Sequence, residues 1–216
     1  MRRRVLRSVL AITCGALAGM AQSSSALAGA PTGVTIKIGQ VGGISDAPIY
    51  IADAKGYFKD QGITIESFSF PSAAGMVVPL GTGELQVGGG ASSAGLFNAI
   101  GRGVGLVIVA DKGNLDPGHG YEAIVIRKEL AGTIKGPRDL KGRSVAISAT
   151  DIPPEITLDA YMRQGGLTVK DVNVVTVSHV DMLQALKNGS IDAGLPIEPT
   201  VSRIIEIGRA SCRERV

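Results

Sequence analysis

The residues best suited to chemistry lie in a turn that is rich in glycine and serine. A short apolar run at residues 85–87 leads into three consecutive glycines, and Ala91, Ser92 and Ser93 follow at the start of a helical pattern over residues 92–102. Because glycine has no Cβ, another backbone or a ligand can approach closely here. Serine can cap a helix, and the unpaired N–H groups of its first turn can hold an anion or a carbonyl oxygen. This turn is therefore a candidate binding site.

Ser93 also raises a catalytic alternative. It lies in the string A-S-S-A-G, which is close to the G-x-S-x-G turn that presents the nucleophile of many hydrolases. With Asp151 and His179 it would complete the chain order Ser, Asp, His. However, alanine stands in place of the first glycine, and His179 does not lie in an obvious late catalytic loop. A helix-capping role for Ser93 needs no such coincidence. We expect the cap, and a serine hydrolase remains the alternative.

Other catalytic and metal-binding patterns are missing from the sequence. No glycine loop ends in Gly-Lys-Ser/Thr, and the glycine-rich residues 101–105 precede a strand pattern instead of following one, which is the wrong context for a dinucleotide site. The two histidines, His119 and His179, lie in separate segments without the spacing of metal ligands, so we expect exposed or capping roles for both. We predict no catalytic residue, metal or cofactor.

The elements that must position these residues alternate between strand and helix patterns. Such alternation favours a parallel α/β sheet. The continuous apolar run at residues 104–110 predicts a strand that is buried on both faces. The expected strands cover residues 34–40, 63–70, 85–87, 104–110, 121–126, 144–148, 172–177 and 191–195, and the expected helices cover residues 49–54, 75–80, 92–102, 154–164 and 181–187.

Residues 111–120 divide the chain into two lobes. Their sequence, DKGNLDPGHG, is dense in turn formers and has no apolar periodicity. Residues 80–88 also resemble residues 186–194, because in each segment a helix pattern ends at a glycine suited to a left-handed C-cap and a short strand follows. We therefore expect lobe 1 at residues 29–115 and lobe 2 at residues 116–205.

The two ends of the chain differ from the rest. Residues 1–28 have an arginine-rich start, a short apolar middle and a small-x-small end, which is typical of a cleaved secretory signal peptide. The apolar part is shorter than the ~20 residues that a membrane span needs. Residues 206–216 match one reading frame of a common sequencing adapter, residue for residue. We expect these residues to be a non-native tail on a truncated gene.

The ends also dominate the charge of the chain. The formal net charge is +3. Seven basic and two acidic residues lie in the two end segments, so residues 29–205 carry about −2. This balance gives no sign of nucleic acid or an anionic membrane as a partner. Both cysteines, Cys14 and Cys212, also lie in the ends, so an exported core would hold no disulfide.

Several segments together resemble one known family. The strings APIYIA and KGYFKDQG between residues 47 and 62 resemble the opening of the nitrate/sulfonate/taurine-type substrate-binding proteins of ABC transporters. Further similar segments follow in the family's order at residues 81–91, 98–103, 139–143 and 185–193 and at Glu198-Pro199. The resemblance implies a two-lobed periplasmic binding fold of the type with two crossovers. In that fold the chain returns to complete lobe 1, so lobe 1 is expected to be incomplete, without an antiparallel strand between residues 85–87 and 104–110.

The same resemblance implies a function. A monomeric periplasmic protein would capture a small solute of the sulfonate, nitrate, taurine or thiamine-precursor class and deliver it to the membrane permease of an ABC importer. The superfamily also includes synthases that make the thiamine pyrimidine from their own histidine and pyridoxal phosphate. A synthase is thus a second enzymatic alternative, although the sequence shows no cysteine-rich motif or suitably placed histidine for it. We expect a binding protein and not an enzyme.

The expected ligand contacts lie in loops at the carboxyl ends of the strands, where open α/β sheets bind ligands. Backbone N–H groups near Ser92 and Ile152 would hold an anionic or carbonyl end of the solute. Asp46 and Glu198, if they face the cleft, would favour an amine or hydroxyl-bearing end. The absence of tryptophan argues against a stacked sugar. The predicted ligand-binding residues are Gly43, Ile44, Ser45, Asp46, Gly90, Ala91 and Ser92 from lobe 1, and Thr150, Asp151, Ile152 and Glu198 from lobe 2.

Overall fold

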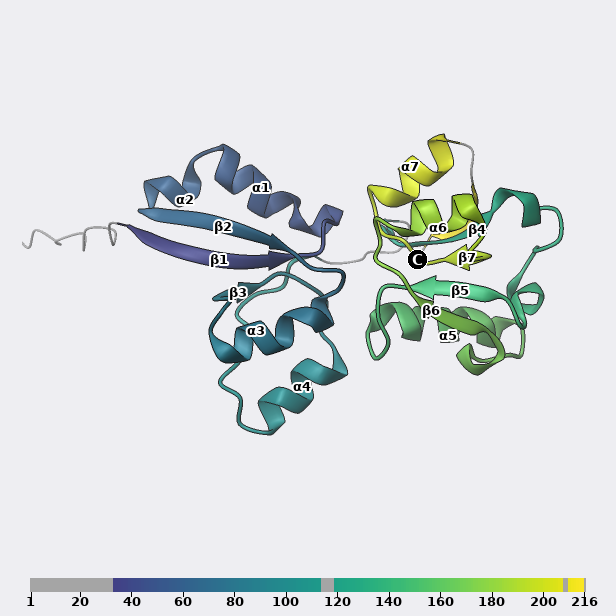
Figure 1. Ribbon diagram of the computed structural model, residues 1–216, viewed down its shortest axis with the longest axis horizontal. Helices are drawn as coiled ribbons and strands as arrows, with labels where there is room; N and C mark the ends of the chain where they lie inside the picture. Colours follow the sequence, from purple (N-terminus) through teal and green to yellow (C-terminus); the bar gives the residue numbers. More distant parts are fainter. Residues whose placement is uncertain (1–32, 114–118, 208–209, 216) are drawn as a thin grey trace, which may run out of the picture.

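The computed structural model describes residues 33–113, 119–207 and 210–215, which form two lobes that each have their own sheet (Figure 1). The sheet of lobe 1 is parallel, with the strand order β2-β1-β3. Its strands are β1 (Val34–Gln40), β2 (Ile63–Ser69) and β3 (Val87–Gly88). The parallel order confirms the α/β class that the alternating pattern predicts.

Helices cover both sides of this first sheet. The short helix η1 (Ile44–Asp46) leads into α1 (Ala47–Ala54) and α2 (Tyr57–Asp60), which lie on one side (Figure 1). On the other side η2 (Ala73–Met76) leads into α3 (Val77–Thr82), and α4 (Ala94–Gly101) follows β3. Each crossover thus returns the chain to the same edge, which brings the loops after β1 and β3 together.

The sheet of lobe 2 is mixed, with the order β6-β5-β7-β4-β8. Strand β5 runs parallel to β6 and β7, whereas β4 runs antiparallel to β7 and β8. The strands are β4 (Ala123–Arg127), β5 (Ser144–Ile147), β6 (Asn173–Thr176), β7 (Ala193–Gly194) and β8 (Ala210–Arg215). The helices are α5 (Pro153–Gln164), α6 (Met182–Asn188) and α7 (Thr200–Glu206), with short helices η3 (Lys128–Leu130), η4 (Pro137–Leu140) and η5 (Val169–Asp171).

The core of lobe 2 has two layers, one on each face of its sheet. In strand β4, Ile124 and Ile126 pack in the cluster that includes Leu158 of α5. Ala123 and Val125, one residue out of step, pack in the cluster that includes Met182 of α6. Alternate side chains of a strand point to opposite faces, so a continuous apolar strand serves both layers. Lobe 2 therefore has three layers, with its sheet between two sets of helices.

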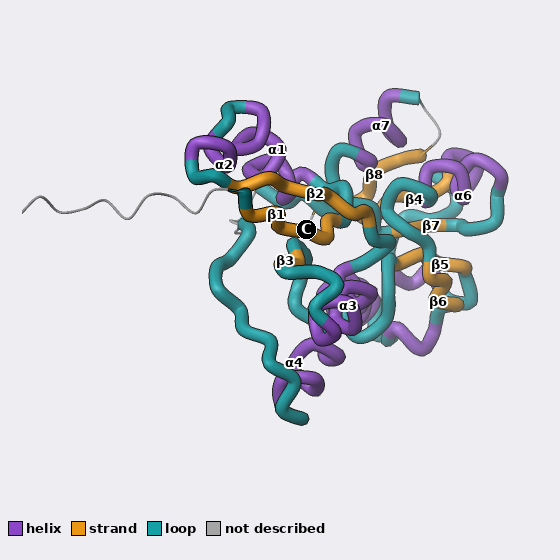
Figure 2. The backbone as a smooth tube through the Cα atoms, turned by 60° about the vertical axis from the view of Figure 1, so that its left-hand side comes forward, coloured by secondary structure: helices purple, strands orange, loops and turns teal. Residues whose placement is uncertain are grey.

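Lobe 1 has a much thinner core. Among its described residues the buried apolar side chains include Ile38, Met76 and Leu85, whereas most of β2 is exposed. The prediction of a buried strand at residues 104–110 is wrong, because the structure has no strand there and leaves Val107 and Val109 80% and 84% exposed. Figure 2 draws this segment as loop, and a groove of about 390 Å³ separates it from β3. An extended segment needs a neighbour for its N–H and C=O groups, and none of the described residues fills that groove.

Local turn chemistry is as the sequence predicts. Helices α3 and α6 end at Gly83 and Gly189, whose φ values of 81° and 78° are left-handed. The remaining predicted helices and strands occur with shifts of a few residues at their ends, and the sequence pattern did not indicate α2, α7 or β8.

Several sequence-based expectations lie wholly or partly outside the described residues. These include the signal peptide at residues 1–28, the boundary between the lobes at residues 115 and 116, and part of the tail at residues 206–216. Of that tail, residues 210–215 pair with β4 at the edge of the second sheet. Within the described ranges, no helix has the length and apolar character of a membrane span.

Candidate functional site

The two lobes meet through backbone contacts on two sides of a shared space. On one side the N–H of Ile44 donates to the carbonyl of Glu198 at 2.9 Å. On the other side the N–H of Ala94 donates to the carbonyl of Asp151 at 3.1 Å. A Cβ on Gly43 would lie 2.3 Å from Cδ1 of Ile197, so a larger residue there would require the end of that side chain to shift. The loops that the sequence singles out are thus the loops that join the lobes.

A cavity of about 260 Å³ lies between these contacts. Both lobes line it, and its wall combines small residues, hydroxyl groups, one carboxyl group and one imidazole. Among the described residues, no lysine or arginine lines it. The lining residues are Val41, Ser45, Ser72, Ala73, Gly90 and Ala91 from lobe 1, and Tyr121, Glu122, Ser148, Ile152, Pro153, Pro154, Thr157, His179 and Ile197 from lobe 2.

Glu122 is the acidic residue of this wall. It is only 8% exposed, and its Oε1 atom has no hydrogen-bond partner. Burial raises the pKa of the Glu122 carboxyl to about 7, and a smaller opposing effect comes from a hydrogen bond with Thr157, which lowers it. Burial also raises the pKa of the neighbouring Tyr121, with a smaller contribution from the charge of Glu122. The carboxyl is therefore close to its titration midpoint at neutral pH.

His179 is the second titratable residue of the wall. It is also 8% exposed, and its Nδ1 atom has no partner. Burial lowers the pKa of His179 to about 4, and a smaller opposing effect comes from a hydrogen bond to the Leu195 backbone, which raises it. The imidazole is therefore neutral at pH 7. The expectation that His179 is exposed or caps a helix is wrong, because the turn after β6 folds in toward the sheet edge. His119, by contrast, is exposed as expected.

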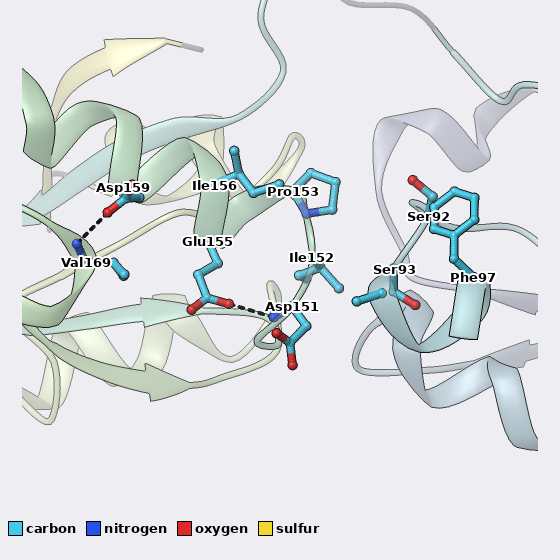
Figure 3. A pocket seen from close by; sticks show the side chains of 11 residues that line it. Ser92, Ser93, Phe97, Asp151, Ile152, Pro153, Glu155, Ile156, Asp159 and Val169 are labelled. Atoms are coloured by element: carbon cyan, nitrogen blue, oxygen red, sulfur yellow. Dashed lines mark hydrogen bonds between the residues drawn. The ribbon is translucent and has the colours of Figure 1, made fainter. Parts of the chain in front are cut away.

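A second, more open groove of about 500 Å³ runs between α4 and α5 (Figure 3). Ser92, Ser93 and Phe97 line it from lobe 1, and Asp151, Ile152 and Glu155 are among the residues that line it from lobe 2. The Glu155 carboxylate accepts the N–H of Asp151 at 2.6 Å, as the dashed line in Figure 3 shows. This bond holds Asp151 at a φ of 58°, a left-handed value that is unusual for a residue other than glycine.

Nine of the eleven predicted ligand-binding residues fall into three groups in the structure, and Thr150 and Asp46 lie outside them. Ser45, Gly90, Ala91 and Ile152 line the central cavity. Ser92 and Asp151 line the outer groove, which Ile152 shares. Gly43, Ile44 and Glu198 form the contact between the lobes. Thr150 is exposed and lines neither space.

Asp46 is fully buried, and its carboxylate is already engaged. Oδ2 accepts the N–H groups of Val41, Gly42 and Gly43 at 3.2, 2.8 and 3.2 Å. Oδ1 accepts the Lys112 ammonium, which also donates to the carbonyl of Gly89 at 2.8 Å. The condition attached to Asp46, that it faces the cleft, is not met in this structure. The residue instead fixes the loop that follows β1.

The carboxylate of Glu198 is also engaged within its own lobe. It accepts the N–H and the hydroxyl of Ser202, each at 3.0 Å, and so stabilises the first turn of α7. The sequence therefore pointed to two carboxylates that already have partners within the protein, and it missed the carboxyl that lines the cavity. Two features of the sequence could have identified Glu122 and His179. Glu122 stands immediately before the apolar strand β4. His179 follows the carboxyl end of β6, and open α/β sheets bind ligands at the carboxyl ends of their strands.

The catalytic reading of Ser93 has no geometric support. Its Oγ accepts the N–H of Leu96 at 3.1 Å, which is the predicted helix cap. No hydrogen bond joins Ser93 to His179 among the described residues. His179 lines the central cavity, whereas Ser93 lines the outer groove.

This arrangement of two α/β lobes around a cavity is that of the periplasmic binding proteins. The family model described as NMT1/THI5 like matches residues 44–203, and the chain belongs to this family. The structure resembles the alkanesulfonate-binding protein SsuA from Xanthomonas axonopodis pv. citri bound to MOPS, with a TM-score of 0.67 at 19% identity over 85% of this chain and 61% of that one. This likeness supports the fold assignment.

Two curated relatives have different activities. The chain is 27% identical to the taurine-binding periplasmic protein of Escherichia coli (strain K12) over 76% of its own length and 49% of the relative. It is 24% identical to the 4-amino-5-hydroxymethyl-2-methylpyrimidine phosphate synthase of Aspergillus parasiticus, over 70% of its own length and 42% of the relative. The chain thus spans about half the length of the curated relatives that it matches.

Proposed function

We propose that this chain belongs to a solute-binding protein that captures a small molecule between its lobes in the periplasm and delivers it to the permease of an ABC importer. The observation that carries the proposal is the cavity of about 260 Å³ that both lobes line. At roughly 30 Å³ for each water in the liquid, this space holds about eight or nine water volumes, which suits a small solute. The taurine-binding relative supports the same class of ligand.

The contacts between the lobes suggest how binding and closure are coupled. The cavity wall is complete only while the loop at Ile44 touches Glu198 and the start of α4 touches Asp151. A solute that contacts both walls binds this closed arrangement more tightly than an open one, and it therefore shifts the population toward closure. A permease that binds the closed conformation better than the open one would then bind mainly the protein that holds a solute.

A synthase is the alternative, and His179 in the cavity wall is the observation that favours it. The described lining residues do not fit pyridoxal phosphate, because none of them is a lysine that could hold its aldehyde or an arginine that could hold its phosphate. The acidic Glu122 in the same wall also disfavours a phosphate dianion. The cavity thus suits reversible binding better than this chemistry.

Calorimetric titration with a panel of taurine, alkanesulfonates, nitrate, aminopyrimidines and amino acids tests the proposal. We expect saturable binding of one solute per chain, without conversion of that solute. Ala91→Trp should abolish binding by filling the cavity, whereas Ala54→Trp, on the exposed end of α1, should leave it unchanged. A folded protein that binds no member of the panel would contradict the proposal. So would turnover of an ester that is lost in Ser93→Ala, or consumption of His179 in the presence of pyridoxal phosphate.

A further inference from the structure

We propose that Glu122 selects solutes that carry an amine, by accepting a hydrogen bond from the amine with its unpartnered oxygen in the cavity. This inference rests on the proposed function and names the ligand class of the same site. A solute of this kind is a zwitterion or a cation rather than a simple anion. The proposal assigns to Glu122 the role that the sequence alone would give to Asp46 and Glu198.

The first support is the way in which the backbone holds Glu122. It pairs with Ile197 in an isolated antiparallel bridge, immediately before β4. The N–H of Glu198 donates to the carbonyl of Tyr121 at 2.8 Å, and the N–H of Ala123 donates to the carbonyl of Pro196 at 3.3 Å. Glu122 is thus held from both neighbouring positions, and its side chain lines the cavity instead of moving out to water.

The second support is that Glu122 and His179 each bury a polar atom that has no hydrogen-bond partner. The Oε1 atom of Glu122 and the Nδ1 atom of His179 are both buried without a partner. The His179 ring is hydrogen-bonded to the Leu195 backbone, and since Nδ1 is the free nitrogen, Nε2 carries the donated proton. Nδ1 of the neutral ring is then an acceptor, as Oε1 is when the carboxyl is ionised. A buried acceptor without a donor is costly, and an ammonium group offers three donors.

The third support is the charge of the wall. The titratable residues that line the cavity are Tyr121, Glu122 and His179, and they come from the residues just before β4 and from the turn after β6. The other walls, from η1, residues 72–73, residues 90–91, Ser148 and the start of α5, contribute no titratable side chain. Among the described residues, no cation is therefore available in the wall to pair with an ionised Glu122. A cationic group of the solute can supply that charge, whereas a simple anion would meet the carboxylate without compensation.

Matched pairs of solutes test this inference directly. Taurine and ethanesulfonate differ only in the amine, and so do β-alanine and propionate. We expect the amine-bearing member to bind wild-type protein at least about tenfold more tightly, the usual effect of one hydrogen bond to a charged group. Glu122→Gln should weaken binding of that member at least about tenfold and change binding of its partner by less than about threefold. Glu129→Gln removes an exposed carboxylate of the same lobe that lines neither space, and it should change neither.

The outcomes separate this inference from the proposed function. If the solute that lacks the amine binds equally well, or if Glu122→Gln weakens both members equally while its melting temperature is unchanged, the inference fails and the binding function stands. If no solute of either kind binds the folded protein, both fail. The pH dependence of the affinity distinguishes a direct contact between Glu122 and the amine from a purely structural role of Glu122. Binding of the amine-bearing member should strengthen from pH 6 to pH 8 in wild type and stay level in Glu122→Gln.

Discussion

The backbone N–H of Ala94 donates to the carbonyl of Asp151 at 3.1 Å, and this bond joins the first turn of α4 in one lobe to the loop after β5 in the other. Helix N-termini carry N–H groups that have no partner within the helix. Here Ser93 caps one of them, and the opposite lobe accepts another. The glycine and serine turn therefore acts as part of the closure between the lobes, beside the cavity that its glycines help to line.

Ala94→Pro tests this contact between the lobes while keeping helix α4. Ala94 is the first residue of α4, where proline is tolerated, and Ser93 before it is already extended, as a residue before proline prefers. The substitution removes the N–H that reaches Asp151, puts a ring carbon in its place against the Asp151 carbonyl, and leaves the helix intact. We expect solute affinity to fall at least about fivefold, since a neutral hydrogen bond contributes about 1 kcal/mol and the ring adds a steric cost. Calorimetric titration measures the loss, and circular dichroism should show unchanged helix content.

Gly95→Ala is the matched control for this prediction. A Cβ on Gly95 would come no closer than 3.7 Å to the Ser93 hydroxyl, and the N–H of Ala94 is kept. We expect unchanged affinity in this variant. An equal loss in both variants would show that the bond to Asp151 is not the cause.

The pairing of Lys112 with Asp46 should matter for the stability of lobe 1. Asp46 has no exposed side-chain surface, and Lys112 donates both to it and to Gly89. Without Lys112, the buried carboxylate of Asp46 keeps only its three backbone N–H donors. We expect Lys112→Met to lower the free energy of unfolding by about 3 kcal/mol in urea titrations. A double-mutant cycle with Asp46→Asn should show a smaller loss for the pair than the sum of the single losses.

Strictly additive losses in that cycle would contradict direct coupling between the two residues. Lys59→Met provides a comparison within the same lobe, because Lys59 lies at the exposed end of α2. We expect that variant to change the free energy of unfolding by less than about 0.5 kcal/mol.

Glu122 and His179 should give the stability of the protein opposite dependences on pH. Between pH 4.5 and about 7 the folded chain keeps the proton on Glu122 that the unfolded chain has released. The contribution of Glu122 to stability therefore falls as the pH rises through this range. His179 has a folded pKa of about 4 against 6.5 in the unfolded chain, so its contribution falls as the pH drops below 6.5. In the wild type the two changes largely cancel between pH 4.5 and 6.5.

Single variants remove this cancellation. Glu122→Gln should gain stability relative to wild type, by about 3 kcal/mol, between pH 4.5 and pH 8, because each pKa unit corresponds to about 1.4 kcal/mol. His179→Gln should become more stable relative to wild type as the pH falls from 7 to 4, because the wild type loses stability over this range. Urea unfolding at pH 4.5, 6 and 8 measures both differences. Parallel pH curves for wild type and Glu122→Gln would show that the carboxyl titrates as an exposed group does.

The loop at residues 104–110 should tolerate polar substitutions despite its apolar sequence. Val109 is 84% exposed, so Val109→Ser should change the free energy of unfolding by less than about 0.5 kcal/mol. Ile126, fully buried in β4, provides the contrast, and Ile126→Ala should cost about 3 kcal/mol. Chemical denaturation of the 216-residue chain measures both values. A large loss in Val109→Ser would show that another part of the protein covers this segment.

The sequence by itself determined the features that depend on neighbouring residues. Alternating apolar patterns predicted most strands and helices. Gly83 and Gly189 predicted two helix ends, where both residues have a left-handed φ. Ser93 was predicted to cap a helix, and it does. These features follow from backbone sterics and hydrogen bonds within a few residues. The loops after the strands were also recognisable, because parallel sheets bring those ends to one edge.

Only the tertiary structure decided which side chains line the cavity and which are already engaged. Asp46 receives the ammonium of Lys112 from 66 residues further along the chain, which turns an apparent ligand group into a structural one. Glu122 and His179 come from different strand ends and line one cavity only after the sheet of lobe 2 has formed. Residues 104–110 have the composition of a buried strand, yet a strand forms only when a neighbour accepts its hydrogen bonds. Burial and pairing are properties of the assembled chain, so local patterns could not reveal them.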